Sequence, residues 1–177
     1  MNLRPDFRLR PAVSADAGRL ADFGARTFSE TFAADNTVED MQMHLASTFS
    51  PERQRREIED PSMLTLVLED AVGQWAGFAQ LRTGKISDGV PREGSIELYR
   101  FYVDSPWHGK GLAAEFMQAV KRQARARGAS SLWLGVWERN ARAQAFYRKH
   151  GFDKVGKQVF VVGRDPQTDD VMWCPLA

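Results

Sequence analysis

The apolar and polar positions of the first third of the chain predict a short strand followed by three helices. FRLRPA (7–12) alternates as a strand does, and Ser14 can begin a helix whose apolar residues recur at helical spacing. Thr37 is a suitable N-cap for a second helix, since two acidic residues follow in its first turn, where the helix dipole favours negative charge. Ser50-Pro51 can begin a third helix, because proline is tolerated at the first helical position.

Three strands are predicted next. MLTLVLED (63–70) and QWAGFAQLR (74–82) are separated by a tight turn through Val72-Gly73, which predicts an antiparallel hairpin. A polar loop with several glycines then leads into SIELYRFYVD (95–104). That segment is rich in β-branched and aromatic residues and apolar on both faces, as a central strand should be.

The second half of the chain alternates between helices and strands. An amphipathic helix begins near Leu112 and ends near Gly128, a typical helix stop, and SLWLGVWE (131–138) is another strand. Asn140 can cap a short helix that buries apolar residues on one face and stops at Gly151.

Two final strands, around 153–162 and 171–176, are expected to flank a polar loop, GRDPQTDD. The order of elements predicts one domain over residues 1–177, of mixed α/β (α+β) class, with a single β-α-β unit in its second half.

Composition and charge exclude several classes of function. The 177 residues contain 24 Lys and Arg against 23 Asp and Glu, a net charge of +1, which argues against a nucleic acid or a membrane surface as partner. The single cysteine, Cys174, cannot form an intramolecular disulfide, fits a reducing cytosol and is expected in a buried strand. No apolar run is long enough for a signal peptide or a membrane span, so a soluble, cytoplasmic protein is predicted. No metal site is predicted.

The segment SPWHGKGLAAEF (105–116) is the strongest candidate for chemistry. Gly109 and Gly111 lie between a predicted strand and a predicted helix, where free backbone N–H groups and the helix dipole favour an anion. The pattern is equally compatible with an ordinary strand-to-helix turn. A Walker A loop is excluded, because no GxxxxGK[ST] is present.

A dinucleotide fingerprint is the second alternative, because Gly109, Gly111 and Ala114 satisfy G-x-G-x-x-A and Glu138 could bind a ribose. Two observations oppose it. Residues 104–108 separate the strand from the first glycine, and only about forty residues follow Glu138, too few to complete a doubly wound sheet.

The third alternative is coenzyme A. FYVDSPWHGKGLAAEFM, followed by LWLGVWERNARAQAFYRKHGF, resembles the two core motifs of the GNAT superfamily of N-acetyltransferases, over roughly residues 95 to 155. The resemblance implies a central mixed, mostly antiparallel sheet with helices on both faces. It also implies that the turn binds the pyrophosphate of acetyl-CoA, the acetyl donor.

Residue roles follow from the same resemblance. It implies that the strand ending at Phe101, Tyr102 and Val103 is bulged, pairs through its backbone with pantetheine and polarises the thioester carbonyl. Asn140 matches an asparagine that meets the cofactor near the splayed strands, and Tyr147 matches the general acid that protonates the leaving thiolate. A core aromatic is the alternative for Tyr147. The pyrophosphate would be bound by Gly109, Lys110, Gly111, Leu112, Ala113 and Ala114.

The chain departs from the family pattern at two positions. His108 stands where Gln or Arg is common, and Gly135 stands where some members carry a carboxylate general base. The base must therefore come from elsewhere. Strand alternation puts Glu97 on the same side as Tyr99 and Phe101, where it could receive a proton through water or hold a cationic substrate. A solvent-exposed glutamate is the alternative.

The identity of the amine is predicted from similarity outside the cofactor motifs. TFSETFAADNTVEDM and VVGRDPQTDDVMW resemble bacterial spermidine/spermine N-acetyltransferases, and Glu30 would lie on their substrate-side helices, unless it belongs to a solvated helix face. A polyamine would suit the carboxylates clustered there. Acetylation of an amino acid, an antibiotic amine, a protein N-terminus or a lysine remains open.

Two other classes of function compete with the acetyltransferase: a non-catalytic acetyl-CoA-binding sensor and a dinucleotide-dependent oxidoreductase. The predicted partner is a small-molecule amine. A homodimer is an option through strand edges of the C-terminal hairpin.

Overall fold

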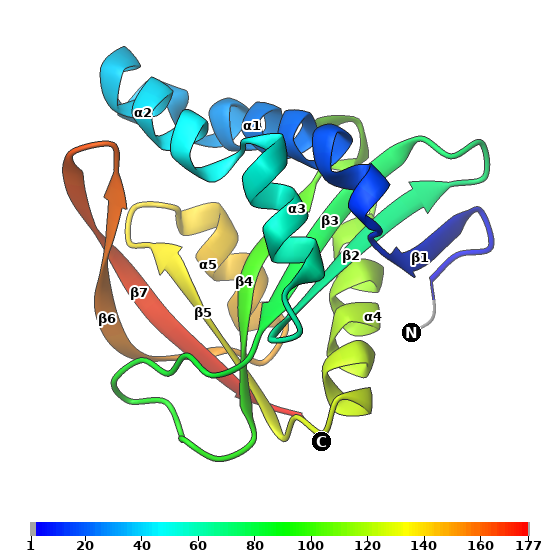
Figure 1. The fold of residues 1–177 in the computed structure, drawn as a ribbon. Helices are drawn as coiled ribbons and strands as arrows, with labels where there is room; N and C mark the ends of the chain where they lie inside the picture. Colours follow the sequence, from blue (N-terminus) through cyan, green and yellow to red (C-terminus); the bar gives the residue numbers. More distant parts are fainter. Residues whose placement is uncertain (1–2, 177) are drawn as a thin grey trace.

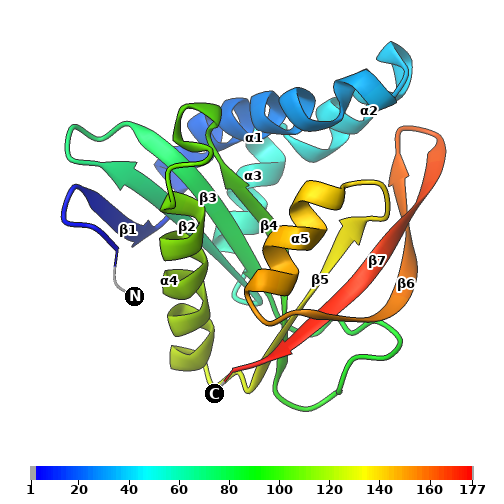
Figure 2. The same ribbon diagram turned by 180° about the vertical axis from the view of Figure 1, so that it is seen from behind.

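The computed structural model describes residues 3–176, which form one seven-stranded sheet with helices on both faces (Figures 1 and 2). The strand order is β1-β2-β3-β4-β5-β7-β6, and every neighbouring pair is antiparallel except β4 and β5. This confirms the predicted mixed α/β class with one parallel β-α-β unit. The strands are β1 (Phe7–Pro11), β2 (Met63–Asp70), β3 (Trp75–Arg82), β4 (Ser95–Val103), β5 (Ser131–Trp137), β6 (Asp153–Val162) and β7 (Asp165–Pro175).

The helices begin where the capping residues predict. Thr37 accepts a hydrogen bond from the backbone N–H of Asp40 at 3.1 Å, Ser50 from Arg53 at 3.2 Å, and Asn140 from Ala143 at 3.0 Å. Each cap satisfies one N–H group that the first helical turn leaves without a partner. The helices are α1 (Ala17–Phe32), α2 (Val38–Thr48), α3 (Pro51–Glu59), α4 (Leu112–Ala126) and α5 (Ala141–Lys149).

Helices α1, α2 and α3 cover one face of the sheet (Figure 1). Leu20, Phe23 and Phe28 of α1, whose spacing predicted the apolar side of that helix, are buried against Val67 of β2 and Phe78 of β3. Burying such side chains contributes about 1.5–3 kcal/mol each, so these contacts fix the helical layer over β2 and β3.

Helices α4 and α5 cover the opposite face (Figure 2). Leu112, Phe116 and Val120 of α4 are fully buried, as their spacing predicts. Cys174 of β7 is buried in the same layer, which confirms its prediction as a buried strand residue. Within residues 3–176 no helix has the length and apolarity that a bilayer crossing requires.

The prediction of a polar loop over residues 163–170 is wrong. Strand β7 begins at Asp165, and only Gly163 and Arg164 connect it to β6. The polar residues pair in register with β6, so the backbone hydrogen bonds of the antiparallel ladder, rather than side-chain polarity, decide the local structure. As a result Asp169 and Asp170 are strand residues with only 7% and 5% of their surface exposed.

Candidate active site

The sheet opens between β4 and β5. These strands pair only from Ser95–Glu97 to Ser131–Trp133 and then diverge. The register between β3 and β4 shifts at the same point, where Tyr99 is an extra residue between the pairs Gln80–Arg100 and Leu81–Leu98. A bulge of this kind bends its strand, which here turns β4 away from β5. We call the gap beyond Glu97 and Trp133 the β4–β5 opening.

The bulge also corrects the predicted side-chain alternation. Leu98 and Phe101 both pack in the cluster under α4 and α5, whereas Arg100 and Tyr102 lie on the face covered by α1 and α3. Glu97 therefore does not share a face with Phe101 as simple alternation predicts, because the extra residue reverses the sides beyond it.

The backbone of β4 is free to bind a ligand at the opening. The N–H of Asp104 donates to the carbonyl of Ala76 on β3, at 2.8 Å. Alternation along an antiparallel strand then directs the N–H groups of Phe101 and Val103 away from β3 and into the β4–β5 opening. Nε2 of His108 lies 2.7 Å from the carbonyl oxygen of Val103, which ties the following turn to the strand end.

The glycine turn, residues 108–111, follows β4 and leads into α4. Gly109 and Gly111 have φ angles of +72° and +80°, a left-handed conformation that residues with a Cβ rarely adopt. The carbonyl of Gly111 accepts from the N–H groups of Ala114 and Glu115. The first N–H groups of α4 precede these, have no intrahelical acceptor and lie at the positive end of the helix dipole. A turn of this geometry at a helix N-terminus is suited to binding an anion.

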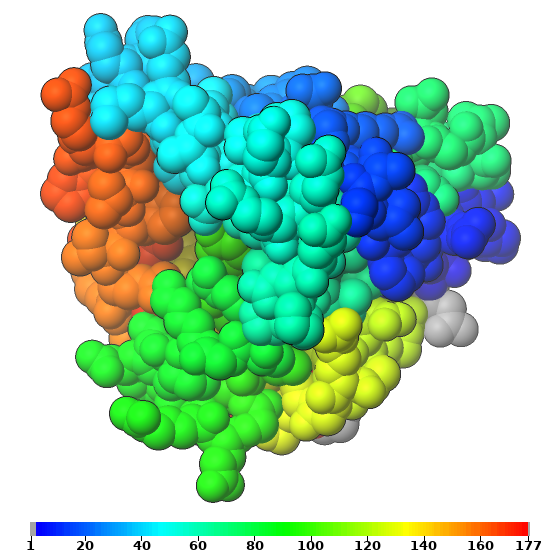
Figure 3. Space-filling view, in the orientation of Figure 1, coloured from blue at the N-terminus to red at the C-terminus, as the bar shows by residue number. Residues whose placement is uncertain are grey.

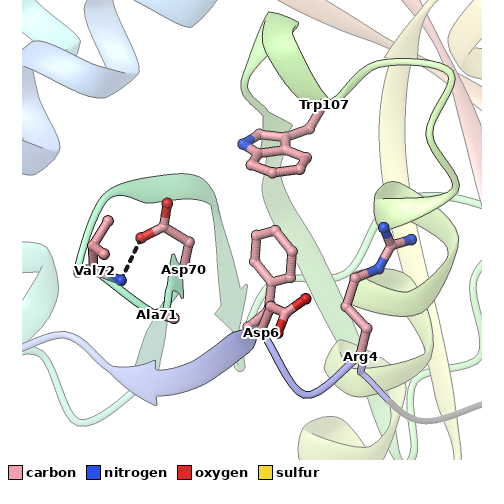
Figure 4. A pocket seen from close by; sticks show the side chains of 7 residues that line it. Arg4, Asp6, Asp70, Ala71, Val72 and Trp107 are labelled. Atoms are coloured by element: carbon pink, nitrogen blue, oxygen red, sulfur yellow. Dashed lines mark hydrogen bonds between the residues drawn. The ribbon is translucent and has the colours of Figure 1, made fainter.

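Arg4 holds the glycine turn from the N-terminal side. Its guanidinium donates to the carbonyl of Lys110 at 3.0 Å and forms an ion pair with Glu115 at 2.6 Å. A hollow of about 270 Å³ is lined by Arg4, Asp6 and Trp107. Figure 4 shows Arg4 and Asp6 below Trp107 in this hollow. The Lys110 ammonium is exposed and lies 5.4 Å from the centre of the Trp107 ring, where it can meet a bound phosphate.

Gly109→Ala is expected to weaken acetyl-CoA binding about tenfold. A Cβ at this φ costs about 1–2 kcal/mol, and the chain relieves that cost by turning the N–H groups away from the anion. Isothermal titration with acetyl-CoA measures the effect. The matched control is Gly128→Ala, because Gly128 has a φ of +81° at the other end of α4 and equally open surroundings. Equal losses of affinity in both variants would contradict a local role of the turn.

Helix α5 brings Asn140 and Tyr147 to the opening. Asn140 lies beyond the end of β5, where its Oδ1 caps the helix. The Tyr147 ring packs edge-on to Phe146 and Phe152, while Phe101 of β4 stacks on Phe146 at 5.8 Å between ring centres. Burial, and secondarily the nearby Tyr102 phenol, raise the pKa of Tyr147. The phenol therefore stays protonated and can act as a proton donor.

A second titratable group lies on the opposite side of the opening. Burial, followed by the charge of Asp170, raises the pKa of Asp169 to about 7. Asp169 is also close enough to Tyr102 to raise the pKa of that phenol, although burial is the larger cause. Tyr147, Tyr102 and Asp169 thus come from three different elements, and Tyr102 interacts electrostatically with each of the other two.

A hollow of about 230 Å³ lies on the face covered by α1, α2 and α3, and we call it the acceptor hollow. Figure 3 shows this face depressed between the α2–α3 segment and β6, with β4 at its base. Most of its lining is aromatic. The Arg100 guanidinium and the His44 imidazole also line it. It is lined by Phe28, His44, Ser47, Thr48, Phe49, Tyr99, Arg100, Tyr102, Phe160 and Val161.

The charges around the acceptor hollow are mostly paired. Arg100 is buried and forms an ion pair with Glu57 at 2.5 Å, and Glu57 also pairs with Arg53 at 2.9 Å. Burial, followed by the positive charges of Arg100 and Arg53, lowers the pKa of His44, so its imidazole is neutral at pH 7.

Glu97 and Glu30, the two acidic residues that the sequence predicts at the site, do not belong to the group of titratable residues at the β4–β5 opening. Glu97 has 3% of its surface exposed, pairs with Arg82 at 2.6 Å, and lies where β4 and β5 are still hydrogen-bonded. Its burial excludes the alternative of a solvent-exposed glutamate. Glu30 is exposed on α1, pairs with Arg26 at 3.0 Å and does not line the acceptor hollow.

The sequence prediction missed Asp169, Arg100 and His44. Arg100 and His44 belong to β4 and α2, and only the fold brings them to the lining of the same hollow. Asp169 was assigned to a loop, and the one available signal was the lack of a carboxylate at Gly135, which demands a replacement from a neighbouring strand.

A strand opening with N–H groups directed into it, a glycine turn at a helix start and a partly buried phenol suit a phosphorylated thioester and the transfer of its acyl group. The model of the acetyltransferase (GNAT) family matches residues 28–152, and the chain belongs to this family. An uncharacterized N-acetyltransferase in the pepI 3' region of Lactobacillus delbrueckii subsp. lactis is 32% identical over 143 residues, which cover 81% of this chain and 82% of that protein.

Solved structures show the same fold. PaiA N-acetyltransferase from Thermoplasma acidophilum, in complex with coenzyme A, has a TM-score of 0.76 and 18% identity, and covers 96% of this chain and 98% of its own. Spermidine N-acetyltransferase from Vibrio cholerae, in complex with CoA and spermine, has a TM-score of 0.69 and 18% identity, and covers 98% and 97%. The protein is therefore an N-acetyltransferase that uses acetyl-CoA as acetyl donor.

Proposed function

We propose that this enzyme acetylates the primary amine of a small acceptor held in the acceptor hollow, by direct attack in a ternary complex. The observation that carries the proposal is the β4–β5 opening. Phe101 faces the α4–α5 side, Tyr102 lines the acceptor hollow on the other side, and the strand between them has free N–H groups. A donor and an acceptor can therefore approach one carbonyl carbon from opposite faces of the sheet.

The residues that would hold acetyl-CoA are those of the glycine turn and of β4. Its pyrophosphate would accept from the N–H groups between Gly109 and Ala114, with Lys110 nearby, and its pantetheine would pair with the backbone of Phe101 and Val103. Asn140 stands at the open end of the strands. When bound, acetyl-CoA supplies the activated acetyl group as a thioester.

The protein's part in the chemistry is to place donors and protons. The free N–H groups of β4 stabilise negative charge on the carbonyl oxygen, an effect of about 3 kcal/mol per donor in comparable sites. Tyr147 gives its proton to the sulfur as the C–S bond breaks and the C–N bond of the amide forms. An ammonium acceptor loses two protons, of which one replaces that of Tyr147 and the other is released to solvent.

The acceptor hollow favours a small amine with an apolar or aromatic body. None of its ten lining residues is acidic, five carry aromatic rings of Phe or Tyr, and about 230 Å³ is below the usual range for drug-sized ligands. A cationic amine can approach the faces of these rings.

The polyamine prediction has less support. A polycation needs several carboxylates, whereas Glu30 is paired with Arg26, and Asp40 accepts from Thr37 and from the N–H of Arg164. The spermidine acetyltransferases resemble this chain at identities that carry the fold alone. A protein substrate would have to insert one lysine side chain or its N-terminal end into the same hollow.

An acceptor panel tests the proposal, with release of free thiol from acetyl-CoA as the readout. We expect release with aromatic or apolar monoamines and amino acids at a kcat/KM at least about tenfold above that for spermidine and spermine, because the hollow has no carboxylate to pair with a second ammonium. Spermidine as the best acceptor would contradict the acceptor class. Tight acetyl-CoA binding without release from any amine would favour a sensor and overturn the proposal.

Two variants locate the acceptor. Phe160 of β6 lines the hollow, and Phe160→Ala should raise the KM for the amine more than the KM for acetyl-CoA. Val159→Ala is the matched control, because the Val159 side chain is next to Phe160 in the sequence but is exposed and does not line the hollow.

A further inference from the structure

Strand β7 supplies a carboxylate where β5 has none. Gly135 lies on β5 beside the β4–β5 opening, and a Cβ built on it would lie 2.9 Å from Oδ2 of Asp169 and in contact with Nε2 of Gln158. The Gln158 amide and the Asp169 carboxylate thus occupy the space that a side chain at position 135 would fill. A larger residue there would have to displace the ends of both side chains, and the glycine lets the Asp169 carboxylate approach β5 closely.

Asp169 faces the acceptor side of the sheet. It is paired with Trp137 across β5 and β7 and with Gln158 across β6 and β7. Trp137 contacts Phe32 of α1 at 6.1 Å between ring centres, so this row of side chains lies on the face of α1 and of the acceptor hollow. Asp169 has 7% of its surface exposed and stands next to Tyr102, which lines that hollow.

The other charged groups around this site already have partners. Glu97 pairs with Arg82, Arg100 with Glu57, and Asp170 with Lys154 at 2.6 Å. Asp170 is directed to the opposite face, because its cross-strand partner Val136 packs in the cluster under α4 and α5. Within residues 3–176, no hydrogen bond or ion pair to the Asp169 carboxylate accompanies its burial.

We propose that Asp169 is the general base that takes a proton from the acceptor ammonium at the β4–β5 opening. The assignment rests on the proposed function. The ammonium transfers one proton to the carboxylate, directly or through water, and the neutral amine attacks the carbonyl carbon. Asp169 then releases that proton to solvent, while Tyr147 on the other side protonates the sulfur.

The electrostatics suit this task. With its pKa raised to about 7 by burial and by Asp170, Asp169 is a stronger base than an exposed carboxylate and is largely deprotonated just above neutral pH. His44 lines the hollow and is a competing candidate base, but burial and the positive charges of Arg100 and Arg53 lower its pKa and weaken it as a base. Tyr102 has a raised pKa and stays protonated over the same range.

The test is the pH dependence of kcat/KM for the acceptor. In the wild type it should rise between pH 6 and 8 through an apparent pKa near 7. Asp169→Asn should lower kcat/KM at pH 8 at least about hundredfold, remove this limb and leave the affinity for acetyl-CoA unchanged. Asp170→Asn is the matched control. It should keep the activity and move the limb to lower pH, because it removes a charge that raises the pKa of Asp169.

A stability measurement separates a functional from a structural role. The pKa of Asp169 is higher in the folded chain than in the unfolded chain, so ionisation costs folding free energy progressively as the pH rises from about 4 to 7. Asp169→Asn should therefore melt at a higher temperature than the wild type at pH 8, and the difference should shrink towards pH 4. A loss of activity together with a lower melting temperature at pH 8 would indicate misfolding and contradict the assignment.

The outcomes distinguish this inference from the function on which it rests. An active wild type whose Asp169→Asn variant keeps the rate and the limb would overturn the assignment of the base alone. A wild type that binds acetyl-CoA but releases no thiol with any amine would overturn the proposed function and this assignment with it.

Discussion

Replacing Tyr147 with phenylalanine is expected to lower kcat at least about hundredfold while leaving the Kd of acetyl-CoA within about twofold. The substitution keeps the ring that packs against Phe146 and Phe152 and removes only the hydroxyl. Without that proton the sulfur must leave as a thiolate. Stopped-flow release of free thiol gives kcat, and titration of the same sample with acetyl-CoA gives the Kd.

The control for this variant is Tyr99→Phe, which removes a phenol that accepts from Arg100 at 3.1 Å on the acceptor side. Its kcat should stay within a few-fold of the wild type. Because burial raises the pKa of Tyr147 above its usual value, the wild-type rate should also show no alkaline decline from loss of this proton up to pH 9. An unchanged kcat in Tyr147→Phe would mean that another group protonates the sulfur.

Glu57→Ala is expected to cost about 3–5 kcal/mol of the free energy of unfolding. Glu57 is the shared partner of Arg100 and Arg53, and Arg100 also donates to Gln80 within the core. Removing the carboxylate leaves a buried guanidinium without its counter-charge. For a chain of this size the melting temperature should fall by on the order of 10 °C. Glu59→Ala on the same helix loses only a hydrogen bond from Ser14 and should cost less than about 1.5 kcal/mol.

The same pair predicts an acid-sensitive fold. Burial alone would raise the pKa of Glu57, but the charge and hydrogen bonds of Arg100, with those of Arg53, outweigh it and lower the pKa. The carboxylate therefore contributes stability above its unfolded pKa of about 4.3, and this contribution is lost as the pH falls through the lowered folded value. Urea unfolding between pH 2 and 7 should show a shallower acid limb in Glu57→Ala. Parallel limbs in variant and wild type would exclude this pair as their cause.

The local elements could be predicted because their signals are contiguous. Thr37, Ser50 and Asn140 each cap a helix within three residues of their own position, and Gly109 with Gly111 permit the left-handed backbone that the turn adopts. The donor side of the site consists of such segments, namely the end of β4, the glycine turn and the first turn of α4. Their order along the chain was therefore sufficient to propose them as the donor site.

Two predictions were wrong where pairing between distant strands decides the structure. Asp165 to Asp170 have the composition of a loop, yet their backbone groups are satisfied by β6 along one side. Simple alternation through Tyr99 fails because the matching of β4 to β3 inserts one extra residue. Neither effect has a local sequence signal, since both depend on the register of a partner strand.

The sequence by itself determined the class of enzyme, the donor and the helix starts, because each depends on residues that are neighbours along the chain. Only the tertiary structure decided which groups come together at the β4–β5 opening. Asp169, Tyr102 and Tyr147 come from β7, β4 and α5, and they meet because the sheet brings β7 beside β5 while the bulge at Tyr99 turns β4 away. Strand register and burial, which set the direction of Asp169 and raise its pKa, arise only when the whole sheet has formed.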